Sequence, residues 1–91
     1  MPTEAYYVTN VCRVPTRQPG LMQYQIYLQA IAPDVPDTIV TTVNNWRAAL
    51  CQRALETHAR VVIGSRETKY GYEAITVVLD EEGVTHASVS R

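Results

Sequence analysis

LMQYQIYLQAIA, residues 21–32, is the stretch of sequence that decides the fold of this chain. Apolar and aromatic side chains occupy the even positions from Met22 to Ala30, and the odd positions between them are mostly glutamines. Alternation with a period of two is typical of a β-strand with one dry face and one wet face. We therefore expect a sheet that is covered on one side only, with this strand at its edge.

Four further strands are expected, at 5–14, 60–65, 72–79 and 84–90. The first has apolar residues on both faces, which indicates a central strand or a β-bulge near Asn10. The last two strands are joined at 80–83 by a tight hairpin turn. Gly83 suits the positive φ of such a turn.

One long helix is expected from about residue 37 to residue 58. The Asp37 carboxylate is the predicted N-cap, because a short acidic side chain accepts from the first free N–H groups. At about 100° per residue, one apolar stripe follows the helix, formed by Ile39, Val43, Trp46, Leu50 and Ala54. β-branched residues crowd the first turns, so packing rather than helix propensity must hold that end.

These elements predict a single α+β domain over 1–91, with a five-stranded, mainly antiparallel sheet and the helix packed on one face. The element order is ββαβββ. If strand 60–65 lies beside 5–14, every neighbouring pair is antiparallel and the strand order is 2-1-3-4-5. If it lies beside 21–32, that pair is parallel. We expect the first arrangement, because 5–14 has the pattern of a central strand and 21–32 that of an edge.

Charge and hydropathy narrow the class of protein. A net charge of −1 argues against a nucleic-acid binder that is held mainly by phosphate contacts. The first residues show no signal-peptide pattern, and no apolar run approaches the roughly 20 residues of a membrane helix. We expect a cytoplasmic protein that makes no membrane contact.

Four residues are candidates for thiol or metal chemistry, namely Cys12, Cys51, His58 and His86. Zinc sites in proteins use closely spaced ligand pairs, and no such pair occurs here. Cys51 and His58 lie two helical turns apart, about 10 Å, which is too far for both side chains to bind one metal ion. The glycines form no phosphate-binding loop. We expect no catalytic residue, no metal and no cofactor, and we expect both cysteines as free thiols.

The wet face of the sheet is the predicted binding surface. It combines tyrosine, amide and arginine side chains, namely Tyr7, Arg13, Gln23, Gln25, Tyr27 and Gln29. Tyrosine and arginine are favoured at protein interfaces, and exposed aromatic rings also stack unpaired bases. A weaker second set lies in two loops that we expect at opposite ends of the domain, namely Arg17, Arg66, Lys69 and Tyr70.

These features predict a small, non-enzymatic binding module that acts through protein–protein contact. We expect an inhibitor, accessory or adaptor protein of a bacterium or phage, able to form a homodimer through the open sheet face or edge. Two alternatives stay open: a small enzyme or ligand carrier with a pocket at a dimer interface, and single-stranded nucleic-acid binding by the sheet face. The negative net charge and the single lysine rank nucleic acid below a protein partner.

Overall fold

The computed structural model describes residues 3–69 and 71–80. Within them it contains one helix and five strands, namely β1 (Thr3–Pro15), β2 (Met22–Ala30), β3 (Thr38–Thr42), α1 (Asn45–Thr57), β4 (Arg60–Thr68) and β5 (Gly71–Asp80). The predicted strand at 84–90 and most of its hairpin turn lie outside the described residues. The α+β class is confirmed.

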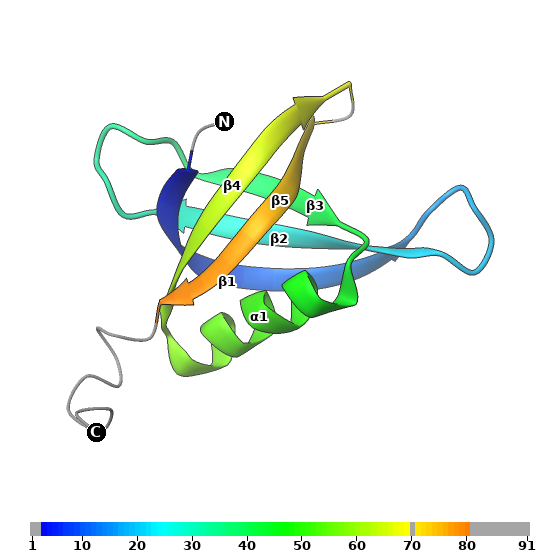
Figure 1. Cartoon of the computed structure of the whole chain (residues 1–91), viewed down its shortest axis with the longest axis horizontal. Helices are drawn as coiled ribbons and strands as arrows, with labels where there is room; N and C mark the ends of the chain where they lie inside the picture. Colours follow the sequence, from blue (N-terminus) through cyan, green and yellow to red (C-terminus); the bar gives the residue numbers. More distant parts are fainter. Residues whose placement is uncertain (1–2, 70, 81–91) are drawn as a thin grey trace.

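The five strands form a closed barrel with the order β1-β2-β3-β5-β4 (Figure 1). β1 pairs antiparallel with β2 and with β4, and β4 pairs antiparallel with β5. These three pairings confirm the arrangement in which strand 60–65 lies beside 5–14. The remaining contacts belong to β3, which pairs antiparallel with β2 and parallel with β5.

The prediction of a helix from residue 37 was wrong at its N-terminal end. Residues 38–42 form β3 with the sequence TIVTT, in which every residue is β-branched. Branched side chains favour the pleated strand over the helix, and two strands are available to pair with this segment. Asp37 caps no helix, and its Oδ1 instead accepts a hydrogen bond from the backbone N–H of Ala30 at 2.9 Å. The helix begins after Asn44, whose Oδ1 accepts from the N–H of Arg47 at 2.9 Å.

The predicted open sheet was also wrong. β2 is not an edge strand, because it pairs with β1 on one side and with β3 on the other. The unforeseen β3 supplies the link between β2 and β5 that closes the barrel. Only the outward side chains of the strands stay uncovered, and α1 packs mainly against β1 and β5 at one end of the barrel (Figure 1).

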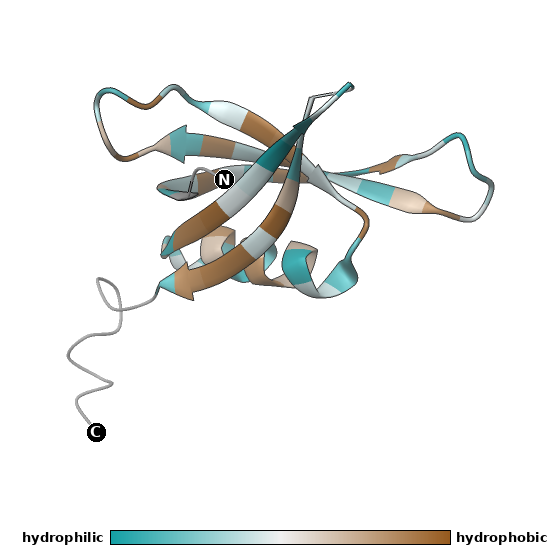
Figure 2. Cartoon of the chain, turned by 45° about the horizontal axis from the view of Figure 1, so that its top comes forward, coloured by the Kyte–Doolittle hydropathy of each residue, from teal (hydrophilic) through white to brown (hydrophobic). Residues whose placement is uncertain are grey.

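The core forms where the inward side chains of the strands meet the helix. Figure 2 shows hydrophobic residues alternating with hydrophilic ones along the strands. The buried cluster contains Tyr6, Val8, Ile26, Leu28, Val40, Cys51, Ala54, Val61, Ile63 and Ala74. The prediction that Trp46 belongs to the buried apolar stripe of the helix was wrong, because its side chain is 71% exposed. The buried helix residues are small, Ala48, Cys51 and Ala54, so α1 lies close to the barrel wall with a different face inward.

A β-bulge interrupts the pairing of β1 with β2 between Val8 and Asn10, which was one of the two alternatives for this strand. A bulge inserts one extra residue, and the strand beyond it presents the opposite side chains to each face. Beyond the bulge the outward positions of β1 are therefore Asn10, Cys12 and Val14, which lie opposite Tyr27, Gln25 and Gln23.

The position of the helix start can be tested at Asn44. Asn44→Ala removes the side-chain acceptor for the N–H of Arg47, so we expect a loss of about 1 kcal/mol in the free energy of unfolding. Asn44→Asp keeps an acceptor there and should retain most of that stability. Urea denaturation followed by circular dichroism measures both variants. An alanine variant as stable as the unmodified protein would contradict this cap.

Candidate functional site

The candidate site is the outer face of β1–β3, which consists of the side chains that point away from the core on these three strands. From Tyr7 onward its members are Tyr7, Asn10, Cys12, Val14, Gln23, Gln25, Tyr27, Gln29, Ile39 and Thr41. Cross-strand partners share a face of a sheet, so the register arranges these side chains in rows. One row joins Asn10, Tyr27 and Ile39, and the next joins Cys12, Gln25 and Thr41.

The structure brings five of the six predicted face residues together, namely Tyr7, Gln23, Gln25, Tyr27 and Gln29. Arg13 is the exception. The bulge turns Arg13 to the other side of the β1–β2 hairpin, where it lies opposite Tyr24. The Tyr24 hydroxyl donates to Oδ1 of Asn45 in α1 at 3.1 Å, so this side of the hairpin faces the helix.

An open hollow lies at each end of the outer face. Tyr7 and Gln29 line a hollow of about 580 Å³, whose far wall contains His58 after the end of α1. Gln23 and Arg17 line another of about 390 Å³, beside the β1–β2 loop. The polar rows of β1 and β2 therefore run between two concave ends.

The β1–β2 loop is shaped by a turn in which the N–H of Leu21 donates to the carbonyl oxygen of Gln18 at 3.1 Å. Pro19 fixes the first central φ, and Gly20 supplies the positive φ of 82° that a type II turn requires. The β1–β2 loop, which contains this turn and Arg17, projects beyond the barrel at the right of Figure 1.

Closure of the barrel places the β1–β2 loop and the β4–β5 turn on either side of the row that joins Cys12, Gln25 and Thr41. Thr41 of the outer face lies opposite Glu73 of β5, and Gly71 at the β4–β5 turn is two residues away. At the other side of the row, Cys12 is three residues from the end of β1 at Pro15. The loops therefore flank the outer face. Lys69 lies in the β4–β5 turn, and Tyr70 lies outside the described residues.

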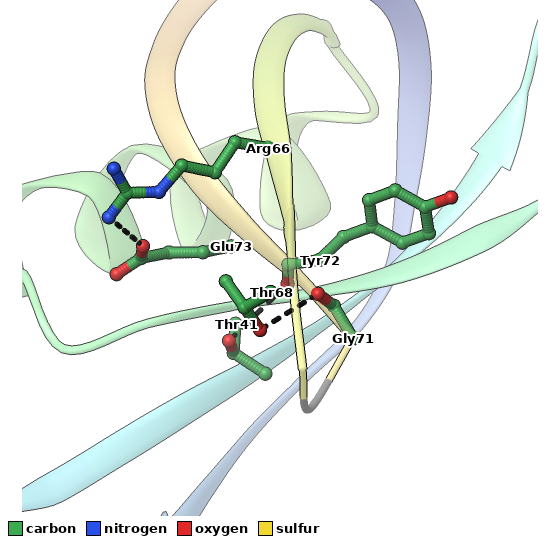
Figure 3. Close-up of polar contacts among 6 residues, drawn as sticks. All are labelled: Thr41, Arg66, Thr68, Gly71, Tyr72 and Glu73. Atoms are coloured by element: carbon green, nitrogen blue, oxygen red, sulfur yellow. Dashed lines mark hydrogen bonds and ion pairs between the residues drawn. The ribbon is translucent and has the colours of Figure 1, made fainter.

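Arg66 is held by an ion pair, in which its Nη2 lies 2.9 Å from Oε1 of Glu73 (Figure 3). This pairing offsets the positive charge of Arg66 at the border of the outer face. The Tyr72 ring points to the opposite side of β5 in the same view. Tyr72 lines a separate hollow of about 380 Å³ at the barrel end, together with Glu4, Tyr6 and Asp34.

Charged residues are segregated along the chain. No aspartate or glutamate occurs at 5–33 or at 38–55, and these two segments hold four arginines, namely Arg13, Arg17, Arg47 and Arg53. The β2–β3 loop carries Asp34 and Asp37, at the end of the barrel opposite the β1–β2 loop (Figure 1). Sequence reasoning missed this pattern because it used the net charge of the whole chain, although the acid-free segments are visible in the sequence itself.

Cys51 and Tyr6 are titratable residues of the core, and burial favours the uncharged form of both side chains. Burial raises the pKa of the Cys51 thiol to about 12, so Cys51 carries no thiolate near neutral pH. Burial, and to a smaller degree the charge of Glu4, raises the pKa of the Tyr6 hydroxyl. Residues 3–69 and 71–80 contain no cluster of three or more histidine, cysteine or acidic side chains able to hold a metal ion. Over the same residues, no helix is both long and apolar enough to cross a membrane.

The two free cysteines differ in surroundings, and their reactivity should differ accordingly. Cys12 lies half-buried on the outer face, whereas Cys51 is fully buried in the core with its raised pKa. Since the thiolate is the reactive form, iodoacetamide at pH 8 should modify Cys12 and spare Cys51 in the folded protein. Mass spectrometry of a Cys12→Ser variant gives the control, which should stay unmodified until urea is added. Rapid native labelling of Cys51 would contradict the packing of α1.

Comparison with known proteins gives no relative from which to carry over a function. No protein-family model matches the chain, and neither curated proteins nor solved structures gave a significant match.

Proposed function

We propose that this protein binds single-stranded nucleic acid along the outer face of β1–β3. The observation that carries the proposal is the composition of that face: two tyrosines stand among four amide side chains, namely Asn10, Gln23, Gln25 and Gln29. No carboxylate occurs on these strands from residue 5 onward. Proteins that bind single strands use such faces, because bases stack on aromatic rings and offer hydrogen-bonding edges to amides.

The dimensions of the face suit this ligand. Side chains on one face of a strand recur about every 7 Å, and the six residue steps from Gln29 to Gln23 span about 20 Å. Tyr7 is 42% exposed, and its neighbour Gln29 shares the hollow that borders His58. A segment of several unstacked nucleotides therefore has an aromatic ring at Tyr7, a second at Tyr27 and amides between and beyond them.

Topology supports the same ligand class. A five-stranded closed barrel with the order 1-2-3-5-4 and a helix between its third and fourth strands has the topology of the oligonucleotide- and oligosaccharide-binding barrel. Such barrels bind on the face of the second and third strands, between the loops that join strands 1–2 and 4–5. In this chain Gln23, Gln25, Tyr27 and Gln29 lie on the outer side of the second strand, and Arg17 lies in the loop that joins strands 1 and 2. One fold serves many functions, so the side chains of the outer face carry the proposal and the topology supports it by analogy.

The net charge of −1 does not oppose this function, because β2, β3 and the β1–β2 loop carry no acidic residue, and Glu73 at the border of the outer face is paired with Arg66. The acid-free segments include β2, β3 and the β1–β2 loop, whereas Asp34 and Asp37 lie at the far end of the barrel. Few arginines are available, so stacking must contribute much of the affinity. Three phosphate contacts would give a slope of about −2 for log K against log salt, from about −0.7 for each contact with a single strand.

The decisive measurement is fluorescence anisotropy of a labelled oligothymidylate of about 16 nucleotides, the upper site size of a barrel of this type, at low salt. Tyr27→Ala should weaken binding about tenfold, since a stacked base contributes about 1–3 kcal/mol. Val78→Ala on the far side of the barrel, where Val78 is 60% exposed, is the control and should bind like the unmodified protein. Absence of binding, or equal binding by Tyr27→Ala, would contradict the proposal.

A protein partner, including a second copy of the chain, is the second candidate. It is favoured by an outward apolar row on β1, β4 and β5, in which Ala5, Val62 and Val78 are cross-strand neighbours. Three small side chains cover far less than the roughly 800 Å² per partner of a stable interface, so we rank this candidate second. The third expectation, an enzyme or ligand carrier with a pocket at a dimer interface, has no comparable observation in its favour.

Self-association through this row predicts a dimer that Val78→Asp dissociates, because a carboxylate would have to be buried against the partner's apolar surface. Light scattering coupled to size exclusion measures the mass of both proteins, with Tyr27→Ala as the control on the opposite face. A monomer for the unmodified protein at high concentration would rule out the homodimer.

A further inference from the structure

We propose that the bound strand continues past the outer face and around the β1–α1 corner, where one base stacks on Trp46 and phosphates are held by Arg13 and Arg47. The β1–α1 corner consists of Arg13, Tyr24, Asn45, Trp46 and Arg47. The proposal rests on the proposed function and extends it, because it adds a contact surface that lies on the other side of the β1–β2 hairpin from Tyr27.

The corner is held together by register and by one hydrogen bond. Arg13 lies opposite Tyr24 in the β1–β2 pairing, so their side chains share the side of the hairpin that faces α1. The Tyr24 hydroxyl donates to Asn45 at 3.1 Å, which ties the hairpin to the first residue of the helix. Trp46 and Arg47 follow directly in the first helical turn. The segments that carry Arg13 and Trp46–Arg47 are more than 30 residues apart in the sequence and are thus brought to the same end of the molecule.

Trp46 is the most unusual member of this corner. Its side chain is 71% exposed, although tryptophan is a largely buried residue in most folded proteins. The preceding Val43 is also exposed, at 47%. The helix cannot bury Trp46, because its small residues Ala48, Cys51 and Ala54 occupy the side that packs on the barrel. A large aromatic ring thus stands in solvent, as a stacking platform for a base requires. Arg47 follows it in the chain, and Arg13 lies opposite Tyr24, whose hydroxyl donates to the preceding Asn45.

Charge at the corner selects an anionic ligand over an apolar protein surface. Within the part of the chain that the structure describes, neither Arg13 nor Arg47 forms an ion pair. No acidic residue lies at 5–33 or 38–55, the two segments from which the corner is built. Arginine side chains in an acid-free setting complement phosphate, which they bind through paired N–H groups.

A route joins the corner to the outer face. β3 pairs with β2 only as far as Tyr24, which lies opposite Thr42. Met22 and Gln23 therefore leave a strand edge without a β3 neighbour, and Gln23 and Arg17 line the hollow at that place. A flexible single strand that lies over Tyr27 and Gln25 can pass around this edge, with Arg17 beside it, and reach Trp46.

Trp46 itself provides the readout, because it is the single tryptophan of the chain. Titration with unlabelled oligothymidylate of about 16 nucleotides should quench its emission, with saturation at the concentration at which anisotropy of the labelled oligonucleotide saturates. Trp46→Ala should weaken binding at least about fivefold, and Trp46→Phe, which keeps a ring, should restore most of the affinity. Thermal unfolding should show little change for either variant, because the side chain is exposed.

The arginines are tested by salt dependence. Arg13→Gln and Arg47→Gln should each reduce the slope of log K against log salt by about 0.7, the value for one phosphate contact with a single strand. Arg53→Gln removes the same charge from the same helix, outside the corner, and serves as the matched control with an unchanged slope.

The outcomes separate the two proposals. If the oligonucleotide binds and Tyr27→Ala weakens it, while Trp46 emission and the affinity of Trp46→Ala stay unchanged, the corner is not part of the site and the proposed function stands. If no oligonucleotide binds at low salt, both proposals fall. Quenching together with a weakened Trp46→Ala variant and reduced slopes for Arg13→Gln and Arg47→Gln establishes the extended path.

Discussion

The parallel pairing of β3 with β5 is the contact on which the rest of the structure depends. It comprises two register pairs, Val40 with Tyr72 and Thr41 with Glu73, and the Thr41 hydroxyl adds a hydrogen bond of 3.4 Å to the Tyr72 carbonyl (Figure 3). Through this short contact an open sheet becomes a barrel. Closure gives β3 a neighbour on both sides and brings the β4–β5 turn to the border of the outer face, so this face is curved and flanked by loops rather than flat and open.

The β-bulge at Thr9 is the second constraint, because it sorts the side chains of β1 between the two surfaces. A shift of one residue moves every later side chain to the opposite face. Asn10 and Cys12 therefore join Tyr27 and Gln25 on the outer face, and Arg13 turns toward α1. The bulge separates an amide-rich surface, suited to bases, from an arginine-bearing surface, suited to phosphates, within one hairpin.

Packing of the helix completes this arrangement. Because Ala48, Cys51 and Ala54 are small, α1 lies close to the barrel, and the bulky Trp46 stays outside. Charge then distinguishes the two ends of the molecule, since Asp34 and Asp37 lie in the β2–β3 loop and Arg17 lies in the β1–β2 loop. A chain of nearly zero net charge can thus offer an anionic ligand a surface without carboxylates, which its overall composition conceals.

The sequence by itself determined the α+β class and the positions of β1, β2, β4 and β5, because alternation and turn residues act over short distances along the chain. It favoured three of their pairings over one alternative, and it offered the bulge as one of two explanations for the pattern of β1. Five of the six predicted face residues lie together on one face of the sheet, and their role in binding stays a prediction. Only the tertiary structure decided that TIVTT at 38–42 is a strand, that the sheet closes, that Arg13 faces the helix and that Trp46 is exposed. The physical reason is common to all four, because the state of each segment depends on partners that are distant in the sequence. β3 is a strand because β2 and β5 offer it backbone hydrogen bonds. A helix residue is buried only where another element covers it.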